Sequence, residues 1–520
     1  MSGNVGGRSR GGRAGGALAL VLVCAAQLMV VLDSTITNIA LPRIGSSLEI
    51  SGAGLSWLVT GYALAFGGFL VVGGRLGDVY GSRRMFIAGL LIFSAGSALG
   101  GAAQTESLLL AARLAQGLGA ALVSPAALAL ITLSFAPGPR RTRAFSAFSA
   151  TAGVGGGVGL ILGGWLTGLD PEWGWRLTFL INVPIGLAAA VLARGVFAVS
   201  PRHTRTLDAP GAALGTIALI TLVYGVTRTG GIADDGGVIG WGDPVVLAML
   251  MIAGLLLVAF VVVERRSAAP MLPLAIVAHR QRATAYLAMT IMPGALFAML
   301  YFLSLYLQNV LGYSPLQTGF AFLPFTLGII VGSLAAGRVI VRIAPRFVAG
   351  AGAVLAGIAL YMFSRLPTVE PGDPILATAR HGDPLVVGVN YWTDIGPFVL
   401  LMSVGIGLTF TTLTLVAMHR LPGRDVGVAS GVLNAVQQVG GALGLAVLSA
   451  AAAPVMSKTA GDIAAQLGEG LSDVAIRAGF SHGASLALFI GAVMLAITAV
   501  VVVGFLSITP RDLAEAGGSD

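Results

Sequence analysis

Long apolar segments, separated by short polar ones, repeat along the whole of this chain. Each contains about 20 residues or more with few charges, which is the length that a helix needs to cross a bilayer. The apolar runs are continuous, whereas the strands of a membrane-spanning β-barrel alternate polar and apolar residues. The pattern therefore predicts an all-α polytopic membrane protein with fourteen spans, at residues 17–41, 55–75, 84–104, 107–134, 143–168, 175–198, 207–228, 243–263, 283–307, 316–340, 346–366, 393–417, 426–453 and 480–507.

The spans are arranged as six, then two, then six. We expect an N-terminal six-helix bundle over 17–200, a two-helix insert over 201–266 and a C-terminal six-helix bundle over 267–507. Short tails complete the chain, one basic over 1–16 and one polar over 508–520. Because the number of spans is even, both tails should lie on the same side of the membrane.

The composition agrees with this class of protein. Of the 520 residues, 56% are hydrophobic and 10% are charged, which excludes a soluble globular protein. The 75 glycines suit helices that pack closely in lipid, where small residues let backbones approach. Cys24 is the only cysteine in the sequence, so no intramolecular disulfide is expected.

The basic residues indicate how the chain is oriented. With the N-terminus in the cytoplasm, 22 of the 30 Lys and Arg residues fall on the cytoplasmic side, 7 fall outside, and Arg113 lies within a span. Since positive charge favours the cytoplasmic side, both termini are predicted there, in the cytoplasmic membrane of a bacterium. The net charge of +8 thus reflects topology, and we expect no nucleic-acid partner.

Asp33 is the acid placed deepest in an apolar segment, about 12 Å from the outer end of the first span. A carboxylate at such a depth costs roughly 2.5 kcal/mol or more unless it has a partner, a wet cavity or a proton. Asp33 is therefore the candidate proton carrier. A carboxylate that a neighbouring helix braces for folding alone is the alternative.

The loop between the second and third spans carries Gly74, Asp78, Gly81, Arg83 and Arg84. Glycine permits a tight turn, an acid suits a helix N-terminus, and arginines anchor at the inner interface. The loop resembles the signature G-x-L-x-D-R-x-G-R-[KR] of the major facilitator superfamily, although Val79 stands where a basic residue is usual. The resemblance implies that the loop latches the inner ends of the two bundles and gates them. A charged turn that sets topology alone is the alternative.

Arg113 lies in the fourth span, about 9 Å below the outer face and so close to the depth of Asp33. An arginine stays charged in nearly any environment, so it needs an acid or a wet cavity, and Asp33 is the candidate acid. The segment 113–119 resembles the superfamily's fourth-helix motif R-x-x-Q-G-x-G, whose arginine is tied to proton coupling. A packing role, with Arg113 bonded to backbone carbonyls, is the alternative.

The fifth span is rich in glycine. Gly155, Gly159 and Gly163 recur every four residues and should form one smooth helix face. Together with Gly164 they are similar to the antiporter motif ending G-P-x-x-G-G, which marks exporters in the superfamily, although Leu160 replaces the usual proline. A nucleotide-binding role is disfavoured because no strand precedes these glycines and no turn interrupts them.

Three further stretches, at residues 32–42, 175–186 and 305–315, are similar to the fourteen-span drug:proton antiporter family. With the number of spans, this resemblance covers residues 17–507. It implies the major facilitator fold, with a proton gradient and no cofactor. We expect a monomer whose partners are protons, the lipid bilayer and a small amphipathic substrate.

The thirteenth span carries Asn434 and Gln438 on one face, where they either line a substrate pathway or bond to neighbouring helices. Tyr62, Tyr306 and Phe410 are further candidates for the wall of a substrate cavity. No cluster of metal ligands and no pairing of a nucleophile with a base stands out. We therefore expect neither a metal site nor an enzyme.

These features predict a proton-coupled efflux transporter that exports amphipathic small molecules, such as drugs or antibiotics, by alternating access. Because the later apolar spans lack further acids, neutral, zwitterionic or monocationic substrates are expected. An exporter dedicated to one endogenous metabolite or lipid is the alternative. An importer is disfavoured by the fifth-span glycines, and a membrane enzyme by the lack of a catalytic cluster.

Overall fold

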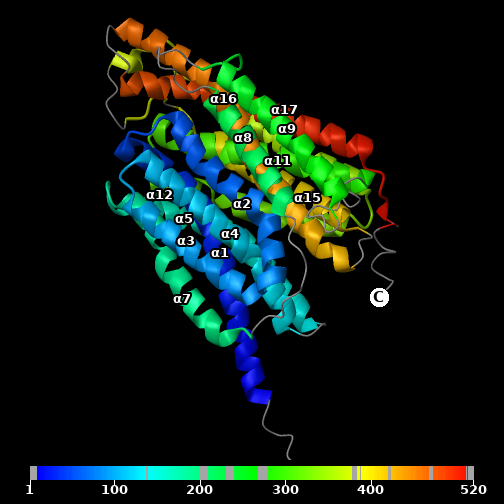
Figure 1. The fold of residues 1–520 in the computed structure, drawn as a ribbon. Helices are drawn as coiled ribbons and strands as arrows, with labels where there is room; N and C mark the ends of the chain where they lie inside the picture. The colour runs from blue at the N-terminus through cyan, green and yellow to red at the C-terminus, as the bar shows by residue number, and fades with distance from the viewer. Residues whose placement is uncertain are drawn as a thin grey trace, which may run out of the picture.

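The computed structural model of the chain describes residues 9–135, 139–198, 209–229, 239–267, 279–377, 383–386, 388–419, 423–467, 472–510 and 512. These residues form helices joined by short connections, and they include no β-strand (Figure 1). In chain order the helices are α1 (Ser9–Leu48), α2 (Gly52–Tyr80), α3 (Ser82–Ala102), α4 (Glu106–Ser134), α5 (Pro139–Leu169), α6 (Gly174–Leu180), α7 (Asn182–Val196), α8 (Ala209–Arg228), α9 (Pro244–Arg266), α11 (Arg280–Leu305), η1 (Tyr306–Val310), α12 (Pro315–Ala321), α13 (Leu323–Val339), α14 (Pro345–Phe363), η2 (Pro374–Ala377), η3 (Tyr391–Ile395), α15 (Gly396–Met418), α16 (Gly423–Leu467) and α17 (Asp473–Phe505). The predicted all-α class is confirmed.

The lengths of these helices match a polytopic membrane protein. In the described part of the chain, 12 helices are long and apolar enough to cross a membrane, and α2 makes a 13th if its two halves, bent by 47°, form one span. The predicted fifth span corresponds to the 31-residue helix α5, of which Gly155–Leu169 is an apolar stretch. The total of fourteen spans therefore stays a prediction.

The first seven helices pack against one another. α4 contacts both α2 and α3, α1 runs along α5, and α3 contacts α6 and α7. Small residues allow the closest of these contacts. A Cβ added to Gly73 of α2 would collide with the carbonyl oxygen of Ala121 on α4, so glycine is what lets these two helices approach.

Helices α11 to α17 form a second group of contacts. α15 contacts α13 and α14, while α17 contacts α11, α14 and α16. The two groups meet where α2, which is blue in Figure 1, contacts α16, which is orange, and where α5 contacts α12 and α13. This interface surrounds the site described below.

Helices α8 and α9 pack on each other, and α8 also contacts α2 and α16. They therefore lie at the edge of the interface between the two groups, as the green helices of Figure 1 show. Among the residues of α9, Val246, Ala253 and Glu264 are buried. Most of this helix therefore faces outward, as expected of a helix that contacts lipid on most sides.

The helices that contain the last two predicted spans extend beyond those spans. The prediction left residues 454–479 between the two spans, whereas α16 continues through Pro454 to Leu467 and α17 already begins at Asp473. The extension is stable because α16 and α17 remain packed together there, with Ala460 and Ile463 buried. A proline inside a helix is tolerated where neighbouring helices support it.

Candidate functional site

A cavity of about 1040 Å³ lies between the two groups of helices. Its walls come from α1, α2, α4, α5, α11, α13 and α16, with Ser82 at the start of α3. At one end it reaches Asn38 and Arg113, and at the other it reaches Asp78 and Thr132, beside the loop that joins α2 to α3. The cavity is therefore large enough for a small organic molecule.

Beyond Asn38 the two groups of helices are joined by direct hydrogen bonds. The Tyr301 hydroxyl donates to the carbonyl oxygen of Gly52 at 3.1 Å, and the Ser304 hydroxyl donates to that of Asn38 at 3.2 Å. Gln308 Nε2 donates to the Ile39 carbonyl oxygen at 3.1 Å. These contacts close the end of the cavity that lies opposite the α2–α3 loop.

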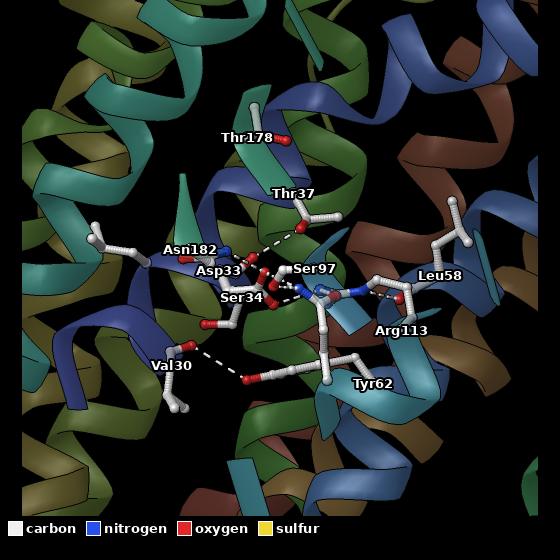
Figure 2. A network of polar contacts seen from close by, with 12 residues as sticks. Val30, Asp33, Ser34, Thr37, Leu58, Tyr62, Ser97, Arg113, Thr178 and Asn182 are labelled. Carbon is white, nitrogen blue, oxygen red and sulfur yellow. Dashed lines mark hydrogen bonds and ion pairs between the residues drawn. The ribbon is translucent and has the colours of Figure 1, made fainter. Parts of the chain in front are cut away.

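Asp33 lies at the centre of a buried polar network beside this cavity (Figure 2). Its Oδ2 accepts a hydrogen bond from Arg113 Nη1 at 2.6 Å. Its Oδ1 accepts from Gln116 Nε2 at 2.6 Å and from Asn182 Nδ2 at 3.0 Å. The carboxylate is thus held by three donors and is 1% exposed.

Arg113 is held just as firmly. Its Nε donates to the Leu58 carbonyl oxygen at 3.0 Å and its Nη1 donates to Gln116 Oε1 at 3.0 Å. The guanidinium carbon also lies 4.2 Å from the centre of the Tyr62 ring, in a cation–π arrangement. Arg113 therefore bonds to an acid as well as to a backbone carbonyl, rather than to carbonyls alone.

Local structure explains how these side chains meet. Arg113 and Gln116 lie one helical turn apart on α4 and so project from the same face. Asn182 is the first residue of α7, directly after a break at Ile181 that separates α6 from α7. Pro184 has no N–H to continue the helical hydrogen bonds back into α6, so the break follows from the sequence.

Asp33 itself does not line the cavity. Its neighbour Ser34 does, as do Tyr62 and Arg113, and Arg113 also bonds to the carboxylate. Arg113 therefore forms an ion pair with Asp33 and also lines the cavity. A molecule in the cavity meets the arginine before it meets the acid.

The residues of the predicted loop lie at the end of α2 and the start of α3, with Gly81 between the two helices. This is the cavity end opposite the hydrogen bonds that join the two groups of helices. Gly81 has a φ of +93°, a value that side chains disfavour, and Asp78 is exposed and lines the cavity. Gly74 lines the cavity as well, but the close approach to α4 is made by its neighbour Gly73. Arg83 Nη2 donates to the Arg194 carbonyl oxygen at the end of α7, and Arg84 is exposed.

The glycines of α5 face two different neighbours. A Cβ on Gly155, Gly159 or Gly163 would collide with α1, at Leu28 and Val31, at Thr35 and at Ile36 respectively. A Cβ on Gly164 would collide with the Pro315 carbonyl oxygen at the start of α12. The four-residue repeat therefore packs on α1, while Gly164 lies against the other group of helices.

The candidates for the cavity wall divide into two sets. Tyr62, Asn434 and Gln438 line the cavity. Tyr306 and Phe410 lie outside its wall in this structure. The Tyr306 side chain is buried and its hydroxyl donates to the Pro367 carbonyl oxygen at 2.6 Å, and Phe410 packs against the apolar core.

Sequence reasoning missed Ser97, Gln116 and Asn182 as members of the Asp33 network. All three side chains are buried, and Ser97 accepts a hydrogen bond from Gln116 Nε2 at 2.9 Å. The available signal was a polar residue inside an apolar span, which in lipid usually needs a partner. In the described part of the chain no group of three or more His, Cys, Asp or Glu residues could hold a metal ion.

The family model of the Major Facilitator Superfamily matches residues 23–445. A puromycin resistance protein of Streptomyces alboniger is 40% identical over 92% of this chain and 89% of its own length. A cephamycin export protein of Amycolatopsis lactamdurans is 37% identical over 88% of this chain and 89% of its own. The multidrug resistance protein Stp of Mycobacterium tuberculosis is 33% identical over 85% and 77%.

The fold is also similar to solved transporters. A bacterial homologue of the human lysosomal transporter Spinster, in an inward-facing and unoccupied conformation, matches with a TM-score of 0.64 over 96% of this chain and 98% of that chain, at 15% identity. The family match and the relatives named for resistance and export are consistent with the fourteen-span drug:proton antiporter family. They identify the chain as a multi-pass membrane transporter rather than an enzyme. The chain belongs to the major facilitator superfamily.

Proposed function

We propose that this protein exports amphipathic small molecules across the bacterial cytoplasmic membrane in exchange for protons, by alternating access. Its relatives are named for antibiotic resistance, multidrug resistance and export, which supports small-molecule efflux. The proton as coupling ion is our own inference from Asp33. An acid buried in a membrane span and placed beside a cavity is a candidate for binding a proton in each cycle.

One observation carries this proposal: the Asp33–Arg113 pair is buried, and Arg113 also lines the cavity. A proton on Asp33 removes the negative charge that holds the guanidinium. Arg113 is then free to change its position in the cavity wall, which alters the site that the substrate meets. Conversely, a substrate that needs Arg113 in its present position favours the ionised acid.

Asp33 does not line the cavity, so direct competition between proton and substrate at its carboxylate does not fit this arrangement. We propose instead two adjacent sites that communicate through Arg113. The coupling free energy between them need be only about 1–3 kcal/mol to bias the two states.

The two states would differ in which end of the cavity is closed. We propose that the bundles 17–200 and 267–507 rock about the cavity and that the α2–α3 loop lies in the cytoplasm. The present structure is then the state that loads substrate from inside, because hydrogen bonds such as Tyr301–Gly52 close the opposite end. In the outward-facing state these bonds would break and the loop end would close.

Transport into inside-out membrane vesicles tests the proposal. Vesicles that contain the protein should accumulate an amphipathic substrate such as puromycin when the lumen is made acidic, and a protonophore should abolish the accumulation. Vesicles with the Asp33→Asn variant at equal abundance serve as the control. Accumulation that persists after the pH gradient collapses would contradict proton-coupled export.

A further inference from the structure

The chemistry of the cavity wall points to a particular class of substrate. Among the described residues, Asp78 at the loop end is the acid in the wall, because Asp33 is enclosed behind other side chains. Both carboxylate oxygens of Asp33 already accept hydrogen bonds. A cation deep in the cavity would therefore lose its hydration without meeting a carboxylate, and that desolvation is costly.

The wall does offer uncharged hydrogen-bonding groups. Four side chains from three helices line the cavity and carry a buried oxygen that has no hydrogen-bond partner among the described residues: Gln27 Oε1 and Asn38 Oδ1 on α1, Ser124 Oγ on α4 and Thr326 Oγ1 on α13. A buried polar atom without a partner costs about 1–3 kcal/mol. A ligand that donates hydrogen bonds to these oxygens after a side-chain rotation would remove that cost.

A donor is present as well. Described residues accept hydrogen bonds from Nε and Nη1 of Arg113, and none accepts one from Nη2. The side chain is 1% exposed and lines the deep end of the cavity. Nη2 can therefore donate to a carbonyl or hydroxyl oxygen of a bound molecule without breaking the bond to Asp33.

Between these polar groups the wall is aromatic. Rings come from four helices and surround the same space: Tyr62 and Phe66 on α2, Phe145 and Phe148 on α5, Phe297 on α11 and Phe325 on α13. Tyr62 and Phe66 lie with ring centres 6.1 Å apart. Such walls suit a flat apolar body, which gains both apolar burial and ring contacts.

We infer that the cavity binds uncharged amphipathic molecules that carry hydrogen-bond donors and acceptors around a flat apolar body. This inference rests on the exporter function proposed above and names its substrate class. Gln27, Asn38, Ser124 and Thr326 accept the donors of the ligand, Arg113 donates to an acceptor, and the rings hold the apolar part.

Equilibrium binding to the purified full-length protein in lipid nanodiscs tests this. The probes are radiolabelled chloramphenicol, which is uncharged and has hydroxyl and amide donors on an aromatic ring, and tetraphenylphosphonium, a permanent cation that forms no conventional hydrogen bonds. Chloramphenicol should bind at least about tenfold more tightly, which corresponds to one or two net hydrogen bonds. The double variant Gln27→Leu/Thr326→Val should weaken chloramphenicol binding by about tenfold and leave tetraphenylphosphonium binding unchanged.

Thr412→Val is the matched control. Thr412 also has a buried hydroxyl without a partner among the described residues, but it lies on α15 outside the cavity wall. The substrate class is wrong if the cation binds as tightly as chloramphenicol, if neither probe binds, or if the double variant behaves like the control. In each case, transport of any substrate that is driven by a pH gradient would still support the proposed function, so the two failures are distinguishable.

Discussion

Arg113 Nη1 and Asp33 Oδ2 lie 2.6 Å apart, and each side chain is 1% exposed. The pair joins α4 to α1 at residues 80 positions apart in the chain. Removing one member of a buried ion pair leaves the other charge uncompensated, which costs far more than removing both. This asymmetry allows a structural role of the pair to be separated from its role in coupling.

Arg113→Ala should therefore destabilise the protein by about 3–5 kcal/mol, because Asp33 stays buried without its counter-ion. The double variant Asp33→Asn/Arg113→Ala should recover most of that loss, since no charge then remains. Thermal unfolding in detergent at constant pH measures both. Equal destabilisation of the single and the double variant would show that the ion pair is not what makes Arg113 necessary.

Asn182→Leu should shift the pH dependence of transport without preventing insertion. The substitution removes one of the three donors to Asp33, so the ionised form becomes less stable and proton release should move to higher pH. The pH profile of substrate-induced proton release in proteoliposomes measures the shift. Asn182→Gln, which can still donate, should recover part of it, and identical profiles for all three proteins would contradict the role assigned to Asn182.

Gly163→Ala should destabilise the protein by about 1–3 kcal/mol, because its Cβ would lie 2.9 Å from Ile36 Cα and force backbone movement in α1. Gly168→Ala is the matched control on the same helix, where a Cβ meets nothing within 4 Å. Thermal unfolding of both variants in detergent compares them. Equal melting temperatures would mean that the α1–α5 contact does not need the glycine.

Much of the fold and part of the site follow from the sequence. Apolar runs of membrane length are rare in other classes of protein, so the helices could be located from the sequence. Asp33 and Arg113 stand out because charges inside such runs are rare, and counting along a helix gives their depth. That count placed Asp33 and Arg113 at a similar depth in the membrane, and the two side chains form an ion pair in the structure.

Other parts of the site depend on packing that a sequence does not contain. Asn182 bonds to Asp33 from 149 positions away, and the packing of α7 beside α1 that allows this contact cannot be read from the sequence. Tyr306 and Phe410 lie in the apolar core rather than in the cavity wall, and the sequence does not separate the two because an aromatic side chain suits both. The length of α16 was underestimated because contact with α17 outweighs the tendency of Pro454 to end a helix.

Asp78→Asn should reduce transport severalfold at unchanged membrane abundance. Asp78 is exposed at the loop end of the cavity, where the proposed gate needs its charge to close in the outward-facing state. Tyr80→Phe, two residues further along α2 and at a side chain that is 52% exposed, is the control and should transport normally. Initial rates in inside-out vesicles measure both, and normal rates for Asp78→Asn would count against a gating role.

The central claim is that Asp33 carries the proton, and substrate-induced proton release in proteoliposomes tests it most directly. Asn has the size of Asp and can hydrogen-bond, but it cannot exchange a proton, so Asp33→Asn tests coupling more than packing. Wild-type protein should release protons in proportion to added substrate across a range of pH. Asp33→Asn, inserted at equal abundance and still able to bind substrate, should release none. Stoichiometric proton release from Asp33→Asn would contradict the account and place the coupling site elsewhere.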